Sequence, residues 1–229
     1  KIKCLIKIHE ISLIRRAVNE LNKVSKKTEV IIVTGFQAQK IKKELKNQKN
    51  VGFLHNKDFH KKEMLHSFYI ALRKFNTDLL FCYSDIIFSK KIVAKIIQSR
   101  QKKIVLPIKS NWKKIWEIRK KNPYKDAENL KINRKNELLE IGTKIKNLNS
   151  VKYQYMGLIY IPRNLRKKVL KNYDILKNKK DTHLTTFLNH LIIKNFQIKC
   201  IKTKENWYEF DDYQDLVQYH KFFRRKSFE

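Results

Sequence analysis

Short, almost wholly apolar segments alternate with amphipathic segments along the first half of this chain. The apolar segments have the length and composition of buried strands, and they span residues 29–33, 51–54 and 78–83. Between them, apolar residues recur at helical spacing, as they do after the predicted N-cap Ser12 at Ile14, Ala17, Val18 and Leu21. Because helical crossovers join parallel strands, this pattern predicts an α/β fold with a Rossmann-like, mixed but mainly parallel sheet flanked by helices.

The second half of the chain is less regular but has no sign of a second domain. A hairpin is predicted around Asn136-Glu137, between strands at 130–132 and 138–141. Further strands are expected at 104–108, 153–161 and 198–202, and further helices at 38–45, 64–75, 90–99 and 184–193 and from about Asp212. We find no internal repeat, low-complexity linker or domain boundary, so we interpret residues 1–229 as one domain.

The composition favours a folded protein without membrane segments. Hydrophobic residues make up 42% of the chain, enough for a substantial core. There is no apolar run of membrane-spanning length and no signal-peptide pattern. The cysteines lie far apart among apolar neighbours, without metal-knuckle spacing, at positions Cys4, Cys82 and Cys200. We therefore expect a cytoplasmic protein with reduced core cysteines and no membrane partner.

The formal net charge of +32 raises the alternative of a nucleic-acid-binding protein. The basic residues are, however, spread over almost every segment, and they form no single tract, arginine–aromatic repeat or recognisable DNA-binding motif. We interpret them as a solvated lysine surface whose field also attracts anionic small molecules. Nucleic acid is therefore not the expected partner, although a basic nucleic-acid-binding protein or an inactive nucleotide-binding relative stays open as an alternative.

Carboxylates cluster in two segments that lie far apart in this acid-poor chain. Asp85 follows the apolar run 78–83, and Glu209 and Asp211 lie in the segment 207–215. On a strand, a spacing of two places Glu209 and Asp211 on one face. Neighbouring carboxylates repel unless a cation lies between them, and Mg²⁺ prefers such oxygen ligands. Ligands of α/β sheets bind beyond the carboxyl ends of the strands, so we predict a Mg²⁺ site formed by Asp85, Glu209 and Asp211.

Each acidic segment also has a purely structural interpretation. Asp85 alone fits a turn or a helix N-cap, and residues 209–211 fit a solvated strand end followed by Asp212 as the cap of the next helix. The metal hypothesis therefore depends on the two segments meeting in the fold. Because Mg²⁺ commonly holds phosphate oxygens, the leading hypothesis is an enzyme that acts on a nucleotide or a phosphorylated substrate.

Two tryptophans, Trp112 and Trp116, lie four residues apart and next to Arg119. They form either an aromatic pair that packs in the core or a hairpin, or an aromatic wall for a substrate with a cationic head group. The sequence alone leaves both interpretations open.

Seven short motifs follow one another in an order that is found in a known family. They are residues 3–5 (KCL), 33–36 (VTGF), 84–88 (SDIIF), 126–128 (DAE), 141–142 (IG), 155–158 (YMGL) and 207–211 (WYEFD). Their order resembles the nucleotidyltransferases of the sugar-nucleotide pyrophosphorylase fold, the nucleotide-diphospho-sugar transferase type. The branch that the chain resembles most is the cytidylyltransferases that activate phosphocholine or phosphonates such as 2-aminoethylphosphonate.

The resemblance implies a reaction and a set of site residues. A phosphate or phosphonate oxygen of the acceptor attacks the α-phosphorus of CTP, and pyrophosphate leaves. By similarity, Lys3 contacts phosphates and is catalytic together with Asp85, while Asp85, Glu209 and Asp211 hold Mg²⁺. The region that binds the acceptor would contain Trp112, Trp116, Arg119 and Glu128. A sugar-1-phosphate nucleotidyltransferase of the same fold is the first alternative.

The start of the chain departs from this family. The family opens with a strand and a glycine-rich loop, approximately Leu-Ala-Ala-Gly-x-Gly-x-Arg, that binds the nucleotide phosphates, and it has proline where this chain has Ile2. We therefore expect a sequence truncated at its N-terminus by about 20 to 25 residues. Such a chain would be inactive and of low stability, because the family's first strand lies centrally in the sheet and its neighbours would lack a hydrogen-bonding partner.

Overall fold

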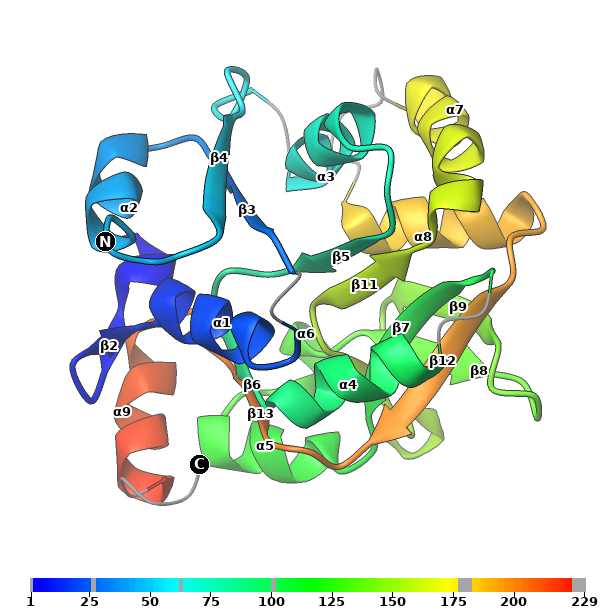
Figure 1. The fold of residues 1–229 in the computed structure, drawn as a ribbon. Coiled ribbons are helices and arrows are strands. Elements are labelled where there is room, and N and C mark those ends of the chain that lie inside the picture. The colour runs from blue at the N-terminus through cyan, green and yellow to red at the C-terminus, as the bar shows by residue number, and fades with distance from the viewer. Residues whose placement is uncertain (1, 26–27, 62–63, 100–101, 177–182, 224–229) are drawn as a thin grey trace.

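A five-stranded mixed sheet forms the centre of the computed structural model, which describes residues 2–25, 28–61, 64–99, 102–176 and 183–223 (Figure 1). Its strands are β5 (Leu79–Cys82), β7 (Ile104–Lys109), β10 (Gln154–Tyr155), β11 (Leu158–Ile161) and β12 (Ile198–Thr203). β12 pairs with β7 in parallel, whereas β10 and β11 run antiparallel to β7, and β11 also runs antiparallel to β5. β5, β7 and β12 therefore share one direction, and the predicted mixed α/β fold is confirmed.

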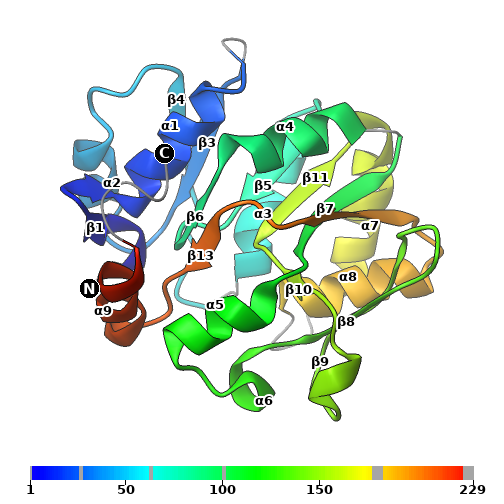
Figure 2. The same cartoon turned by 90° about the horizontal axis from the view of Figure 1, so that it is seen from below.

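Alternate side chains of the central strands enter two different cores, because successive side chains of a strand point to opposite faces. Val105 and Leu158 pack with Ile92 and Ile96 of α4 (Lys90–Ser99), whereas Leu106 and the strand residues that share its face pack against the other helices. Those helices are α3 (Met64–Lys74), α7 (Arg166–Leu176) and α8 (Leu184–Ile193). Figures 1 and 2 show α4 on one face of the sheet and α8 on the other. Burial on both faces explains why these strands are nearly continuous apolar sequence.

A smaller parallel unit is formed near the N-terminus by β3 (Val30–Thr34), α2 (Ala38–Glu44) and β4 (Val51–His55). It packs against α1 (Leu13–Asn22), whose predicted cap is confirmed because the Ser12 hydroxyl accepts a hydrogen bond from the amide of Arg15. The short elements before α1 are η1 (Lys3–Leu5), β1 (Lys7–Ile8) and β2 (Ile11–Ser12). Among the described residues, β3 and β4 pair only with each other and form a sheet of their own.

A short antiparallel pair brings together the segments that carry the acidic residues. β6 (Ile86–Phe88) pairs with β13 (Trp207–Glu209), with Glu209 opposite Ile86. The amide of Phe210 continues the ladder by donating a hydrogen bond of 2.9 Å to the carbonyl oxygen of Asp85. β13 leads into α9 (Tyr213–Phe222), which is capped by Asp212 as predicted. β6 was not predicted as a strand, because its three residues are too few to show a period of two.

Further elements differ from the sequence predictions in some regions and agree with them in others. The stretch after Asn111, for which no element was predicted, forms α5 (Trp112–Arg119) and α6 (Pro123–Asp126). The predicted strand 153–161 is interrupted at Gly157, whose φ of +72° separates β10 from β11. The predicted hairpin is confirmed as β8 (Asn129–Ile132) and β9 (Leu138–Thr143), and short 3₁₀ turns η2 and η3 span Leu148–Ser150 and Arg163–Leu165.

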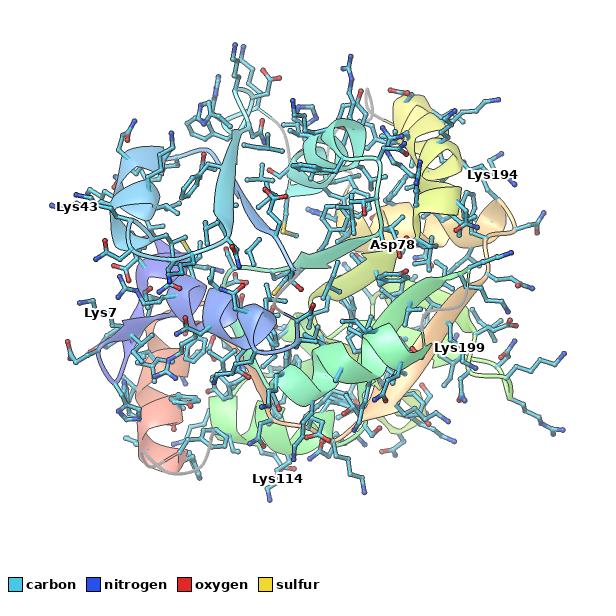
Figure 3. All side chains as sticks on the ribbon, viewed as in Figure 1. Lys7, Lys43, Asp78, Lys114, Lys194 and Lys199 are labelled. Carbon is cyan, nitrogen blue, oxygen red and sulfur yellow. The ribbon has the colours of Figure 1, made fainter. Side chains whose placement is uncertain are left out.

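The basic residues are distributed around the molecule. Figure 3 shows lysine side chains that point outward on several sides, including the labelled Lys7, Lys43, Lys114 and Lys199. Of the helices in the described ranges, none combines the length and the apolar character needed to cross a bilayer.

The conformation of Gly142 in β9 makes a prediction about stability. Its φ is +81°, and an added Cβ would lie 2.7 Å from the Cβ of Thr185 at the start of α8. We expect Gly142→Ala to lower the free energy of unfolding by about 1–3 kcal/mol, through backbone strain and this clash, in a denaturant titration. Gly52→Ala is the matched control, because its closest contact at 2.7 Å is the movable terminal methyl of Ile31 and its φ is not positive. Equal losses in the two variants would contradict this account.

Candidate active site

The two acidic segments meet at one end of the β6–β13 pair, where they share a lysine. Asp85 precedes β6, Asp211 follows β13, and Lys3 reaches them from η1. The Lys3 Nζ lies 3.5 Å from Asp85 Oδ2 and 3.3 Å from Asp211 Oδ1. Burial opposes the charge of Lys3, but the two aspartates raise the pKa of its ammonium group. The predicted convergence of Asp85 with the 209–211 segment is therefore present, and a side-chain cation bridges it.

Glu209 lies on the same face as Asp211 and is the most perturbed acid of the site. Tyr208 and Phe210 point the other way and are fully buried in the core, as the alternation along a strand predicts. Burial, and then repulsion from Asp211, raises the pKa of Glu209 to about 8, although the nearby Arg119 opposes the shift. Burial also raises the pKa of Asp85, against the influence of Lys3. The site therefore holds more negative charge than its cations fully neutralise.

Arg119, predicted to bind the acceptor, lies behind the site and is fully buried. Its Nε and Nη2 donate to the two carboxylate oxygens of Asp215 at 2.9 and 3.2 Å, and Nη2 also donates to Asp211. Its Nη1 lies 3.5 Å from Asp126 Oδ2 and 3.6 Å from Glu209 Oε2. This corrects the sequence prediction, because the guanidinium is enclosed by carboxylates of the protein and does not line the pocket.

A pocket of about 370 Å³ opens beside these acids. Four carboxylates line it, from Asp126, Glu128, Glu209 and Asp211. The rest of the lining is mostly polar or aromatic: Met64, Leu65, Tyr83, Trp116, Gln154, Tyr155, Gly157, His183, Leu184 and Thr185. The pocket therefore favours a cationic or hydrogen-bond-donating group over an anionic one.

Glu128, predicted to bind the acceptor, is a wall residue of this pocket. Its Oε1 accepts a hydrogen bond of 3.3 Å from the Thr185 hydroxyl, and its backbone is held on both sides by the side-chain amide of Gln154. Burial raises the pKa of Glu128, while the bond from Thr185 opposes the shift. The carboxylate is therefore fixed in direction but poorly neutralised, which suits it to receive a donor from a ligand.

The two tryptophans have different roles, and only one of them reaches the pocket. Trp112 is 1% exposed, its indole N–H donates to the Val151 carbonyl at 3.2 Å, and it contacts Trp116 edge to face. Trp112 is thus a packing residue, which corrects its prediction as part of a substrate wall. Trp116 stacks on Trp207 and contributes to the pocket lining.

Several residues of the site had no role that was predicted from the sequence. Asp126 and Tyr155 lay inside recognised motifs, and that position was the one available signal for them. Gln154 and Thr185 reach Glu128 only through the fold, since Thr185 is 57 residues away along the chain. Asp215 looked like one more acid of a polar helix start, yet it is fully buried.

The carboxylates supply the type of oxygen ligand that a metal ion needs, but they are not arranged to bind one in this structure. Within the described part of the chain, no group of three or more His, Cys, Asp or Glu side chains is placed to hold a metal ion. Asp85 and Asp211 instead share the Lys3 ammonium. The donors are all hard carboxylate oxygens, and mutual repulsion contributes to the raised pKa values of Asp85 and Glu209, so the donor set fits Mg²⁺.

Comparison with known proteins identifies relatives in sequence and in fold. The profile of the MobA-like NTP transferase domain matches residues 1–170. The CTP:phosphoglutamine cytidylyltransferase of Campylobacter jejuni subsp. jejuni serotype O:2 is 28% identical, over 93% of this chain and 89% of the relative. The inositol-1-phosphate CTP transferase of T. maritima has a similar fold, with a TM-score of 0.75 at 16% identity over 94% of this chain and 84% of its own. The CTP:phosphocholine cytidylyltransferase of Streptococcus pneumoniae aligns with a TM-score of 0.68 at 14% identity, over 96% and 88% of the two chains.

The raised pKa of Glu209 predicts that stability falls as the pH rises. The carboxyl has an ordinary pKa of 4.5, whereas in the fold its pKa is about 8. Between these two pH values the folded state therefore binds more protons than the unfolded state. The contribution of the Glu209 carboxyl to the free energy of unfolding is then complete below pH 4.5 and is lost as the pH rises towards about 8. In EDTA, we expect the melting temperature to drop more for the wild type than for Glu209→Gln between about pH 5 and about pH 8. Parallel pH profiles would contradict the raised pKa.

Proposed function

The chain belongs to the MobA-like NTP transferase domain family and is a nucleotidyltransferase, and from this premise we propose that it transfers CMP from CTP to a small phosphorylated or phosphonate acceptor. The choice of CTP is supported by the Campylobacter relative and by two structural neighbours that are named for CTP. The observation that carries the proposal is the meeting of Lys3, Asp85, Glu209 and Asp211 beside a carboxylate-lined pocket.

In the proposed reaction, an oxygen of the acceptor phosphate or phosphonate forms a bond to the α-phosphorus of CTP. The bond from that phosphorus to the oxygen bridging the α- and β-phosphates breaks, and pyrophosphate leaves with this oxygen. The chemistry needs positioning and charge neutralisation more than covalent help from the protein. We assign Lys3, whose ammonium is partly exposed at the site, to the nucleotide phosphates.

We propose that Asp85, Glu209 and Asp211 hold Mg²⁺ when the enzyme works. The bound ion would neutralise charge on the phosphate oxygens that react. Burial, and after it the negative charge of nearby carboxylates, raises the pKa values of Glu209 and Asp85, and a divalent cation would favour their ionised forms, which supports the assignment. The protein would contribute three carboxylates from two chain segments, and the Lys3 ammonium would give up its place between Asp85 and Asp211 to the ion.

The pocket supports the proposed acceptor class. Four carboxylates around about 370 Å³ attract an ammonium or quaternary ammonium group, and Trp116 offers an aromatic surface next to them. Phosphocholine and 2-aminoethylphosphonate carry such groups. The alternative of a sugar-1-phosphate acceptor draws support from Gln154 and Thr185, which are able to bond to hydroxyls, but these side chains already bond to Glu128.

The first test removes charge from Asp211 while keeping its shape. The intact protein should release pyrophosphate from CTP only with Mg²⁺ and a suitable acceptor, and Asp211→Asn should lose most of the rate, at least about 100-fold. Asp78→Asn is the matched control, because Asp78 accepts a hydrogen bond from the amide of Arg163 at the far end of β5. Near-normal turnover of a folded Asp211→Asn variant would show that the assigned role is wrong.

The second test addresses the acceptor. Glu128→Gln should raise KM for a cationic acceptor about tenfold or more, because a bond to a charged group is lost, while KM for CTP stays nearly constant. Trp112→Phe should lower the melting temperature without changing KM for the acceptor, because Trp112 is a core residue. The screen should include phosphocholine, 2-aminoethylphosphonate, phosphoglutamine and hexose-1-phosphates. A preference for the hexose-1-phosphates would replace the cationic acceptor with the sugar-1-phosphate alternative.

A further inference from the structure

Arg119 has a surplus of carboxylate partners for a buried residue. A single carboxylate is enough to neutralise a guanidinium, yet four lie around this one, from α6, the end of β13 and α9. Three of the four also line the pocket: Asp126, Glu209 and Asp211. The fourth, Asp215, is fully buried and has no access to a ligand. Arg119 and Asp215 together therefore form the layer directly behind the site.

Asp215 fixes the backbone at the point where β13 ends. Its Oδ2 accepts hydrogen bonds from the amides of Asp211 at 2.8 Å and Asp212 at 3.3 Å, and the Asp212 side chain accepts the Asp215 amide in return. The Tyr208 hydroxyl donates to the Asp215 carbonyl at 3.1 Å, which ties the start of α9 back to β13. The Asp215 carboxylate thus fixes the backbone of Asp211 and Asp212, and the Asp215 main-chain carbonyl ties α9 to Tyr208.

Arg119 connects this backbone anchor to the side chains of the site. Its planar fork bonds both oxygens of Asp215 and also the side chain of Asp211, while Nη1 lies between Asp126 and Glu209. The guanidinium lies 5.0 Å from the ring centre of Trp116, and this contact fixes its plane. A lysine ammonium is a single point charge and does not bond all these groups in one plane.

We propose that Arg119 and Asp215 act as a positioning pair, which holds Glu209 and Asp211 in the geometry of the transfer reaction without touching CTP or the acceptor. The proposal rests on the proposed function for the reaction that the carboxylates serve. Burying such a pair brings little net stability, because the desolvation of both charges offsets their attraction. The pair instead fixes the positions of the Glu209 and Asp211 side chains, which would otherwise repel each other.

The test compares Arg119→Lys and Asp215→Asn with the wild type, at a temperature at which melting curves show every protein folded. Both variants should lower kcat for pyrophosphate release about 100-fold, because small displacements of site groups are costly, while KM for CTP changes by less than about threefold. Hydrogen–deuterium exchange of the amides at residues 209–213 should be faster in both variants. Arg166→Lys is the matched control, because the Arg166 guanidinium donates to the carbonyls of Leu72 and Arg73 at the end of α3, and its replacement should change neither readout.

The two readouts separate this proposal from the proposed function. A wild type that releases no pyrophosphate with any acceptor would refute the proposed function, while the exchange at 209–213 would still decide whether the pair positions this segment. Unchanged exchange and unchanged kcat in Arg119→Lys and Asp215→Asn would overturn the positioning pair. Failure of both variants to fold would also overturn it, because the role of the pair would then be purely structural. A rise in KM for CTP at constant kcat would assign Arg119 to nucleotide binding instead.

Discussion

The short β6–β13 ladder is the interaction on which the site depends. It joins two segments that are more than a hundred residues apart, and its backbone hydrogen bonds place Asp85 beside the 209–211 segment. Three residues of ladder are too few to hold by themselves. They are held by burial, because Trp207, Tyr208 and Phe210 are almost completely buried in the same core as Ile86 and Phe88. Buried aromatic side chains on both faces, Tyr208 and Phe210 on one and Trp207 on the other, therefore stabilise a segment in which Glu209 and Asp211 concentrate negative charge.

That concentration of charge sets what the site is able to do. Carboxylates held this close either take up protons, attract a cation, or are neutralised by the protein itself. Two of these responses are visible here: the pKa of Glu209 is raised, and the protein itself neutralises acids, since Lys3 bridges Asp85 and Asp211 and Arg119 pairs with Asp211 and Asp215. Lys3 is half exposed, whereas Arg119 is fully buried. Of these two cations, the lysine is therefore the one that the proposed function assigns to phosphate groups, while the arginine is enclosed by carboxylates of the protein.

Elements with a local sequence pattern were predicted correctly. Several features that depend on contacts between distant segments were not. The cap at Ser12, the helix 90–99 and the hairpin around Asn136 were predictable from spacing and turn residues. The strand β6 was too short to recognise, and nothing in the polar stretch after Asn111 separated a helix from a loop. Asp85, Glu209 and Asp211 were predictable as a set because strand ends and alternation constrain them. The burial of Arg119 was not predictable, because an arginine in a basic sequence is expected to be exposed, and its four carboxylate partners come together only in the fold.

The distribution of charge links the surface to the pocket. The chain carries a net charge of +32, and its lysines point outward on several sides, while the pocket is lined by four carboxylates. A positive surface raises the local concentration of anions such as nucleoside triphosphates and phosphorylated acceptors, and this steering weakens as salt is added. It does not select among anions. Under the proposed function, the pocket would select the acceptor. Its carboxylates would attract an acceptor with a cationic group, and this attraction is stronger where water is excluded. Under the proposed function, opposite charges in different parts of the molecule would therefore serve the two tasks, the positive surface attracting phosphates and the acidic pocket choosing the acceptor.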